Sequence, residues 1–396
     1  MKQLLTILAL TVLIILTTEE SSAIPAFARK YNLSCQTCHS PMPRLKAYGD
    51  DFAGNGFALT DKESPRYFAE TGDEELSLIR DIPVAVRMDL YGSYNYSNKE
   101  KADFGTPYLL KFLSGGSLAK DIAYYFYFFF SERGEVAGIE DAFFMFNNIL
   151  GIDMDLYVGQ FQIADPLFKR ELRLTLDDYN IYKLKVGLSN SNLTYDRGLM
   201  LTLGLDIGTD IILEVLNGNG IGKPDEFKVF DKDKHKSYFG RVSQEITDFL
   251  RIGAFGYFGK EDLASNTTST TAEYLFAGPD ITLAFNDLVE LNCQYVYRSD
   301  DKTFLTENDF NPTGKIETNG GFAELIITPD GDNSKVYGSL LFNYIDSDLK
   351  ELNQKSGTLH LGYLLRRNIR LIGEYTFTSA KEKDYSKVIL GIVTAF

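Results

Sequence analysis

Apolar and polar residues alternate with a period of two along most of this chain. In the segment 358–365, Leu359, Leu361 and Tyr363 fall on one face of an extended strand, and His360 falls on the other. Alternation of this kind is typical of a β-strand with one apolar and one polar face. The pattern therefore predicts a protein built mainly from strands.

Sixteen segments show this pattern. Their predicted spans are 82–97, 107–118, 121–132, 136–147, 153–163, 195–206, 209–217, 236–247, 249–260, 271–283, 287–299, 317–329, 333–347, 355–366, 368–380 and 386–396. The connections after even-numbered segments are mostly short, and those after odd-numbered segments are mostly longer and charged. An even number of strands joined in this way indicates an all-β fold, a 16-stranded antiparallel transmembrane β-barrel.

The alternative fold is a large soluble β-sandwich or β-propeller, which also contains many short strands. Two features favour the barrel. The apolar faces are rich in Leu, Ile, Tyr and Phe, whereas the opposite faces carry Arg, Glu, Gln and Thr. The chain also ends in a strand whose last residue is Phe396, which resembles the assembly signal of bacterial outer-membrane proteins.

Composition and charge agree with a large sheet. The 396 residues include 24 Tyr, 29 Phe and 33 Gly but only 11 Pro. The formal net charge of −15 argues against nucleic acid and against anionic membrane surfaces as partners. One long connection, 164–193, interrupts the strands between the fifth and sixth segments. It is expected either to fold into the barrel lumen or to form a solvated surface loop.

The N-terminus predicts export. Lys2 precedes an apolar stretch, and Ser21 and Ala23 stand at the −3 and −1 positions of a cleavage site, which is the pattern of a secretory signal peptide. No other run of about 18 apolar residues follows, so strands would have to cross any membrane. The predicted division is a signal peptide at 1–23, an N-terminal segment at 24–81 and the barrel at 82–396.

A Cys-x-x-Cys-His motif lies in the N-terminal segment, at Cys35, Cys38 and His39. Two thiols can add to the two haem vinyl groups, and the imidazole beside the second thiol can bind the iron. The alternatives are a redox dithiol or a chance pair. We expect one covalent haem c with His39 as the proximal iron ligand, in a short helical segment. The third cysteine, Cys293, alternates with apolar residues and is predicted to face lipid.

The motif leaves the sixth iron ligand open. Met42 follows His39 too closely to reach the opposite side of the ring, and His235 lies in a charged loop. His360 and Met200 both stand opposite apolar residues and are predicted to face the lumen. Either is a candidate distal ligand, with His360 preferred, and a five-coordinate or water-bound iron is the alternative. His360 is also interpretable as a simple polar group of the lumen.

The N-terminal segment resembles the corresponding part of the fused cytochrome–porin proteins, which include the outer-membrane iron oxidases of iron-oxidising bacteria. The resemblance covers about 35 residues, and the barrel matches only in architecture. The residues that carry it are Phe27, Arg29, Cys35, Cys38, His39, Pro43, Leu45, Tyr48, Gly49, Phe52, Gly56 and Phe57.

The resemblance implies an electron conduit in the bacterial outer membrane, with both chain termini on the periplasmic side. Its single haem would pass electrons between an extracellular donor, with Fe(II) as the first candidate, and a periplasmic cytochrome. Acidic loops would concentrate such a cation, although they would also bind bridging divalent ions or merely stay solvated. Iron oxidation is thus the candidate activity. The alternatives are a diffusion porin with a haem-bearing plug and a soluble periplasmic cytochrome with a β-rich domain.

Overall fold

The computed structural model describes residues 26–59, 68–69, 71–73, 75–96, 101–132, 135–136, 138–285, 287–381 and 384–396. The predicted signal peptide at 1–23 lies outside this part of the chain. In the described part of the chain, three short helices precede the sheet: α2 (Ala26–Tyr31), α3 (Cys35–Cys38) and α4 (Ala47–Gly54). Among the described residues, no helix is long and apolar enough to cross a membrane.

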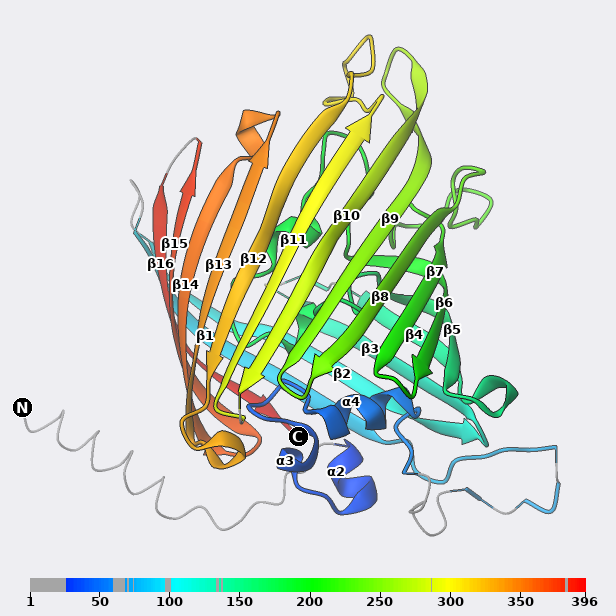
Figure 1. Ribbon diagram of the computed structural model, residues 1–396, viewed down its shortest axis with the longest axis vertical. Coiled ribbons are helices and arrows are strands. Elements are labelled where there is room, and N and C mark those ends of the chain that lie inside the picture. Colours follow the sequence, from blue (N-terminus) through cyan, green and yellow to red (C-terminus); the bar gives the residue numbers. More distant parts are fainter. Residues whose placement is uncertain are drawn as a thin grey trace, which may run out of the picture.

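The sheet is a closed barrel in which every strand pairs antiparallel with its neighbours in sequence, and β1 pairs with β16 (Figure 1). The predicted fold is therefore confirmed. The strands are β1 (Val84–Tyr96), β2 (Lys101–Ala119), β3 (Ile122–Glu132), β4 (Gly138–Phe146), β5 (Met154–Gln162), β6 (Tyr195–Leu205), β7 (Thr209–Leu216), β8 (Ser237–Thr247), β9 (Leu250–Ala264), β10 (Ser269–Phe285), β11 (Val289–Asp301), β12 (Ile316–Ile327), β13 (Val336–Ser347), β14 (Gln354–Arg366), β15 (Ile369–Ala380) and β16 (Tyr385–Ala395).

One predicted boundary is wrong by more than a few residues. Strand β2 begins at Lys101, whereas the sequence pattern places its start at 107. Pro107 cannot donate a ladder hydrogen bond and suggests a strand boundary. The register with β1 shifts at this level, between the Asp89 and Tyr91 pairings. Pairing then resumes, so the strand continues beyond the proline.

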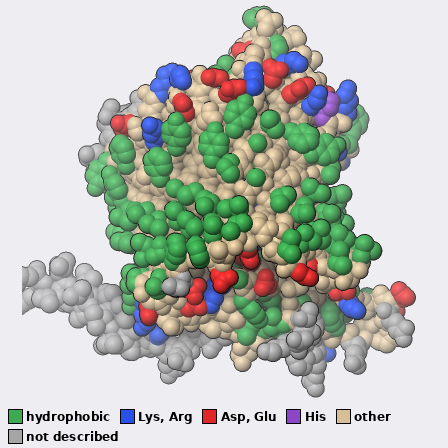
Figure 2. Space-filling view, viewed as in Figure 1, with side chains coloured by type: hydrophobic (Ala, Val, Ile, Leu, Met, Phe, Trp, Pro, Cys, Tyr) green, Lys and Arg blue, Asp and Glu red, His purple; other side chains and the backbone are tan. Residues whose placement is uncertain are grey.

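On the face shown in Figure 2, a broad apolar surface covers the middle of the barrel wall, and charged side chains gather toward both ends. Leu359, Leu361 and Tyr363 on β14 are 43–54% exposed, whereas His360 between them is fully buried. Cys293 lies on the same outward face as Tyr295, while its neighbours Asn292 and Gln294 are buried. An apolar exterior around a polar interior is the arrangement of a barrel that crosses a membrane.

Residues 164–193, hereafter the lumen loop, fold into the barrel. Tyr179 donates a 2.8 Å hydrogen bond to Glu324 on β12, and Tyr182 donates one of 3.2 Å to Gln294 on β11. Tyr179 and Ile181 are almost fully buried, and they join a hydrophobic cluster with inward-facing side chains of the wall. The segment is predicted either to fold into the lumen or to form a solvated surface loop, and it folds into the lumen.

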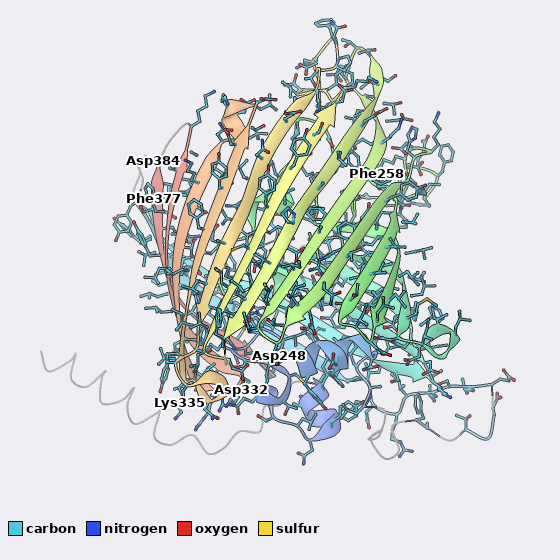
Figure 3. All side chains as sticks on the ribbon, in the orientation of Figure 1. Asp248, Phe258, Asp332, Lys335, Phe377 and Asp384 are labelled. Atoms are coloured by element: carbon cyan, nitrogen blue, oxygen red, sulfur yellow. The ribbon has the colours of Figure 1, made fainter. Side chains whose placement is uncertain are left out.

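The two ends of the barrel differ. The helices lie beneath the end that carries the short turns, and the C-terminus reaches the same end (Figure 1). Asp248, in the β8–β9 turn, and Asp332, in the β12–β13 turn, lie at this end, whereas Asp384 lies toward the other end (Figure 3). The longer β7–β8 and β11–β12 connections extend from that other end.

This arrangement predicts which epitopes are accessible on cells. A tag inserted at Asp233, in the β7–β8 connection, or at Asp348, in the β13–β14 connection, lies at the end opposite the helices and should bind antibody on intact cells. A tag at Arg367 lies in the β14–β15 turn beside α3 and should bind antibody only after the membrane is opened. The reverse pattern would show that the barrel is inserted with its short turns outside.

Candidate haem-attachment site

Helix α3 is one turn long and brings the two cysteines together. Its first residue is Cys35 and its last is Cys38. The hydroxyl of Ser34 accepts a 3.3 Å hydrogen bond from the Gln36 N–H and caps the helix. The His39 N–H donates to the Cys35 carbonyl at 2.9 Å, so the chain leaves the helix at His39. One turn of helix therefore presents two thiols and an imidazole next to one another.

The backbone that follows fixes the imidazole. His39 Nδ1 lies 2.8 Å from the Pro43 carbonyl oxygen and 3.2 Å from that of Arg44. A carbonyl can only accept, so Nδ1 carries the proton and Nε2 is left with a free lone pair. Burial lowers the pKa of His39, although both hydrogen bonds oppose this effect. A neutral imidazole whose Nδ1 is held by a carbonyl is the form that binds a metal through Nε2.

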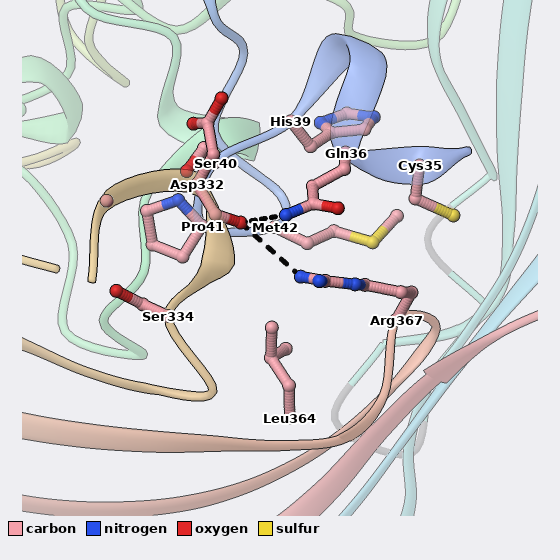
Figure 4. Close-up of a pocket in the computed structure, with 11 residues that line it drawn as sticks. Cys35, Gln36, His39, Ser40, Pro41, Met42, Asp332, Ser334, Leu364 and Arg367 are labelled. Atoms are coloured by element: carbon pink, nitrogen blue, oxygen red, sulfur yellow. Dashed lines mark hydrogen bonds between the residues drawn. The ribbon is translucent and has the colours of Figure 1, made fainter. Parts of the chain in front are cut away.

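Both thiols are free and partly buried, and burial raises the pKa of Cys35 and of Cys38. Cys35, His39 and Met42 line a cavity of about 10 Å³ closed by Leu364 and Arg367 (Figure 4). That volume corresponds to about one water molecule. The donor set fits a c-type haem, and its attachment would require the Met42 and Arg367 side chains to swing aside.

Helix α4 supports α3 from behind. The Lys46 N–H donates a 2.8 Å hydrogen bond to the Cys38 carbonyl. Gly49 faces the same carbonyl, and a Cβ placed there would lie 2.3 Å from the Cys38 oxygen and 3.0 Å from a methyl carbon of Leu45. The close packing of the two helices thus depends on glycine at this position.

This packing gives a prediction for Gly49→Ala. The added methyl group cannot be accommodated against backbone, and overpacking of this kind costs about 1–3 kcal/mol. We expect less covalent haem on a denaturing gel at equal barrel content. Gly54→Ala is the matched control, because the same helix has open space at Gly54. Equal haem content in the two variants would contradict the assigned role of the α3–α4 contact.

The haem-motif segment, residues 26–59, is tied to the barrel end by several polar contacts. Arg44 pairs with Glu290 on β11, and Lys46 pairs with Asp332 in the β12–β13 turn. Arg370 on β15 donates to the Met42 carbonyl. These contacts come from β11, the β12–β13 turn and β15, and they hold the motif against this end of the barrel.

A second set of contacts is aromatic and lies on the other side of the segment. Phe57 stacks on Tyr125 of β3 with 5.1 Å between ring centroids, and Phe27 stacks on Phe57 at 4.8 Å. Asn147, in the β4–β5 connection, donates a 2.6 Å hydrogen bond to the Gly54 carbonyl. The segment therefore spans the lumen opening from β3 to β15.

The structure places His360 inside the wall, but not at the cavity of Cys35 and His39. His360 Nδ1 lies 2.9 Å from Glu374 Oε2, and its ring stacks on Tyr337 at 5.9 Å. Tyr337 Oη in turn accepts a 3.2 Å hydrogen bond from Arg370, which also holds Met42. His360 is thus connected to the motif through two side chains.

Met200 faces inward, as predicted, but it is surrounded by the hydrophobic cluster of the lumen loop. It is 7% exposed and packs in the same cluster as Phe239, Phe255 and Tyr257. No described residue of the haem-motif segment belongs to that cluster. Of the two predicted candidates, His360 is the one that the structure connects to the motif.

The sequence pattern does not predict which residues dock the segment, above all Asp332 and Arg370. Period-two alternation already places Arg370 on the inward face of its strand. Its partner, the Met42 carbonyl, is more than 300 residues away. Strand alternation predicts the direction of a side chain, but it cannot identify a contact between a strand and a separately folded segment.

Comparison with known proteins supports the barrel. No protein-family profile matches the chain, and no curated protein matches it. Among solved structures, the anion-selective porin from Comamonas acidovorans superimposes with a TM-score of 0.56 at 13% identity, over 80% of this chain and 99% of that one. OprB of Pseudomonas putida gives 0.54 at 10% identity, over 80% and 94%. OmpF of Salmonella typhi gives 0.54 at 12%, over 80% and 97%. At these identities the likeness shows a porin-like barrel fold.

Proposed function

We propose that this chain is a bacterial outer-membrane electron-transfer protein that carries one covalent c-type haem at the periplasmic opening of its barrel. The observation that carries the proposal is the docked motif. Two adjacent thiols and an imidazole with a free Nε2 lie at the end of a barrel to which salt bridges tie them. A redox dithiol would need neither the adjacent histidine nor this fixed imidazole.

Each residue of the motif has a defined role in the proposal. Cys35 and Cys38 would form the two thioether bonds, and His39 Nε2 would bind the iron. The Pro43 and Arg44 carbonyls orient the imidazole ring. A bound haem would supply a one-electron couple whose potential depends on its ligands and surroundings.

A chain of aromatic rings supports electron passage through the lumen. From Phe57 it continues along the inward face of β3 through Tyr125, Tyr127 and Phe129. Successive ring centroids are 5.1, 6.1 and 5.5 Å apart. Tyr127 and Phe129 are nearly fully buried. A membrane's hydrocarbon core is about 30 Å thick, so closely spaced buried rings shorten the gaps that an electron has to cross.

The proposed donor is ferrous iron at the outer loops, and the proposed acceptor is a periplasmic cytochrome. The net charge of −15 favours a cationic donor at the surface, because negative potential raises the local cation concentration. In this scheme the ion stays outside and only its electron crosses the barrel.

The test uses proteoliposomes that contain the purified holoprotein. Ferrous iron is added on the side of the long connections, and haem absorbance is followed, with a ferrous chelator trapped inside. We expect haem reduction without colour from the chelator. If the haem stays oxidised with external iron but is reduced by dithionite, the conduit proposal is wrong.

A diffusion porin with a haem-bearing plug is the second candidate. The fold comparisons favour it, because the matched structures are outer-membrane porins. The lumen loop opposes it, because this loop and the wall bury a continuous hydrophobic cluster inside the barrel. Liposome swelling in neutral sugars distinguishes the two candidates, since a diffusion porin admits sugars at rates that a filled barrel does not.

The distal iron ligand is proposed to be His360. Its Nε2 is buried and has no hydrogen-bond partner among the described residues, so it is available to a metal. We expect His360→Ala to convert a low-spin haem spectrum to high-spin, with recovery on added imidazole. Met200→Ala is the parallel variant and should leave the spectrum unchanged. A low-spin spectrum that persists in His360→Ala would exclude this ligand.

A further inference from the structure

A second cavity lies deeper in the lumen than the haem motif. It has a volume of about 70 Å³ and lies between residues 170–176 of the lumen loop and the wall formed by β1–β3, β15 and β16. A water molecule needs about 10–15 Å³ of such volume, so the cavity has room for several waters or a small polyatomic ion. We call this cavity the lumen chamber.

The chamber lining is rich in guanidinium groups. Four arginines line it, Arg87, Arg170, Arg173 and Arg370, whereas its acidic side chains are Asp89, Glu132 and Glu171. The arginines come from β1, from β15 and from the lumen loop, so three separate parts of the chain direct positive charge into one enclosed space.

Two of these arginines are already neutralised by close partners. Arg87 makes two hydrogen bonds to Asp89, of 2.9 and 2.8 Å. Arg170 Nε lies 3.1 and 3.2 Å from the two oxygens of Asp178. Among the acidic side chains, Glu171 is held at 2.8 Å by Lys111. Because these side chains are paired within the protein, they contribute little net charge for binding another ligand.

The other two arginines lack a carboxylate of their own. Arg173 lies 3.8 Å from Asp178, which Arg170 already engages, and its Nε donates instead to the Asp177 carbonyl at 3.2 Å. Arg370 is 5% exposed and donates only to neutral oxygens, the Met42 carbonyl and Tyr337 Oη. No carboxylate of the described chain forms an ion pair with it. Arg370 is a buried cation without a counter-ion, which is costly, and Arg173 has to share Asp178 with Arg170. This pair of guanidinium groups therefore favours an anion.

We propose that the lumen chamber binds a small inorganic oxyanion of the phosphate or sulfate type, held chiefly by Arg173 and Arg370. The planar fork of guanidinium donors matches the oxygens of a tetrahedral oxyanion and can bind two of them at once. The chamber is large enough for such an ion and too small for an organic phosphate of nucleotide size.

This site goes beyond the proposed electron transfer and does not depend on it. The barrel wall and the lumen loop form the chamber, and the haem-motif segment contributes only the Met42 carbonyl that Arg370 contacts. Anion binding can therefore be measured whether or not the chain passes electrons.

The experiment is calorimetric titration of the purified full-length holoprotein with sodium phosphate, and separately with sodium sulfate, in a chloride buffer of constant ionic strength. We expect saturable binding of one oxyanion per chain. Arg370→Gln and Arg173→Gln should each weaken it at least about tenfold, which corresponds to the loss of one charge-assisted hydrogen-bonding group. Arg251→Gln is the matched control, because it removes an equal charge from a half-exposed arginine that is paired with Asp210 and does not line the chamber.

Each outcome decides the proposal. Absence of saturable phosphate and sulfate binding in the unaltered protein would overturn it, as would equal weakening in Arg251→Gln. Heat-modifiable gel mobility reports whether each variant forms the barrel. If Arg370→Gln fails to assemble, the proposal is tested by the affinity of Arg173→Gln and Arg370→Lys for phosphate and sulfate. Arg370→Lys should bind with intermediate affinity because it keeps the charge and loses the fork.

Discussion

Replacing both Cys35 and Cys38 with alanine is expected to abolish covalent haem staining on a denaturing gel. Both cysteines lie on α3, directly before His39, and Cys35 lines the same cavity as His39. The third cysteine, Cys293, is on the outward face of β11 and cannot reach the motif. Cys293→Ser is therefore the control and should keep full staining and an unchanged haem spectrum.

The double variant should still assemble a barrel. All sixteen strands pair through their own backbone ladders, and the motif contributes side-chain and loop contacts to one end only. Heat-modifiable mobility of the unboiled protein measures assembly independently of staining. Staining that persists in the double variant would show that the haem attachment is assigned wrongly. A shifted Soret band in Cys293→Ser would contradict the outward facing of that residue.

The architecture could be predicted because a membrane barrel repeats one simple rule. Each strand must present apolar side chains to lipid and polar side chains to the lumen. Apolar and polar residues therefore alternate in the sequence of every strand. The pattern around His360 is an example, since it fixes both the strand and the inward direction of the imidazole. Pro107 shows the limit of the rule, because a local bulge lets pairing continue where a proline suggests an end.

The interior could not be predicted to the same extent. The lumen loop is irregularly apolar because its side chains face a curved wall and not a regular neighbour. Tyr179 bonds to Glu324 across 145 residues of sequence, and no periodicity encodes such a contact. The same holds for the lumen chamber, whose arginines come from β1, β15 and the lumen loop.

The haem motif is the opposite case, because its chemistry is local. Cys35, Cys38 and His39 follow one another within five residues, so their spacing alone indicates the ligand. The sequence does not indicate what faces them. Leu364 at the end of β14 and Arg367 in the turn after it close the cavity, more than 300 residues later in the chain. The proposed distal ligand lies at a similarly distant position.

Replacing the lumen loop with a two-residue turn is expected to open the barrel to ions and small solutes. The Ile163 N–H donates a 2.7 Å hydrogen bond to the Thr194 carbonyl, so the ends of β5 and β6 are adjacent. Asn-Gly in place of residues 164–193 would therefore close a type I′ hairpin without disturbing the ladder. The deletion removes the buried side chains that fill the lumen, and barrels of 16 strands then leave an aqueous channel.

The measurement is single-channel conductance in planar bilayers, where the deletion should convert small or absent steps into large, stable ones. In the unaltered protein the loop is expected to stay packed in the lumen. Tyr179, Ile181 and Tyr182 bury their side chains against the wall, and the Leu176 N–H donates a 2.8 Å hydrogen bond to Glu374. Removal of residues 226–228 is the control, since they form an exposed turn of the β7–β8 connection. It should leave conductance unchanged. Equal conductance in the deleted and full-length proteins would mean that the haem-motif segment, and not the lumen loop, closes the barrel.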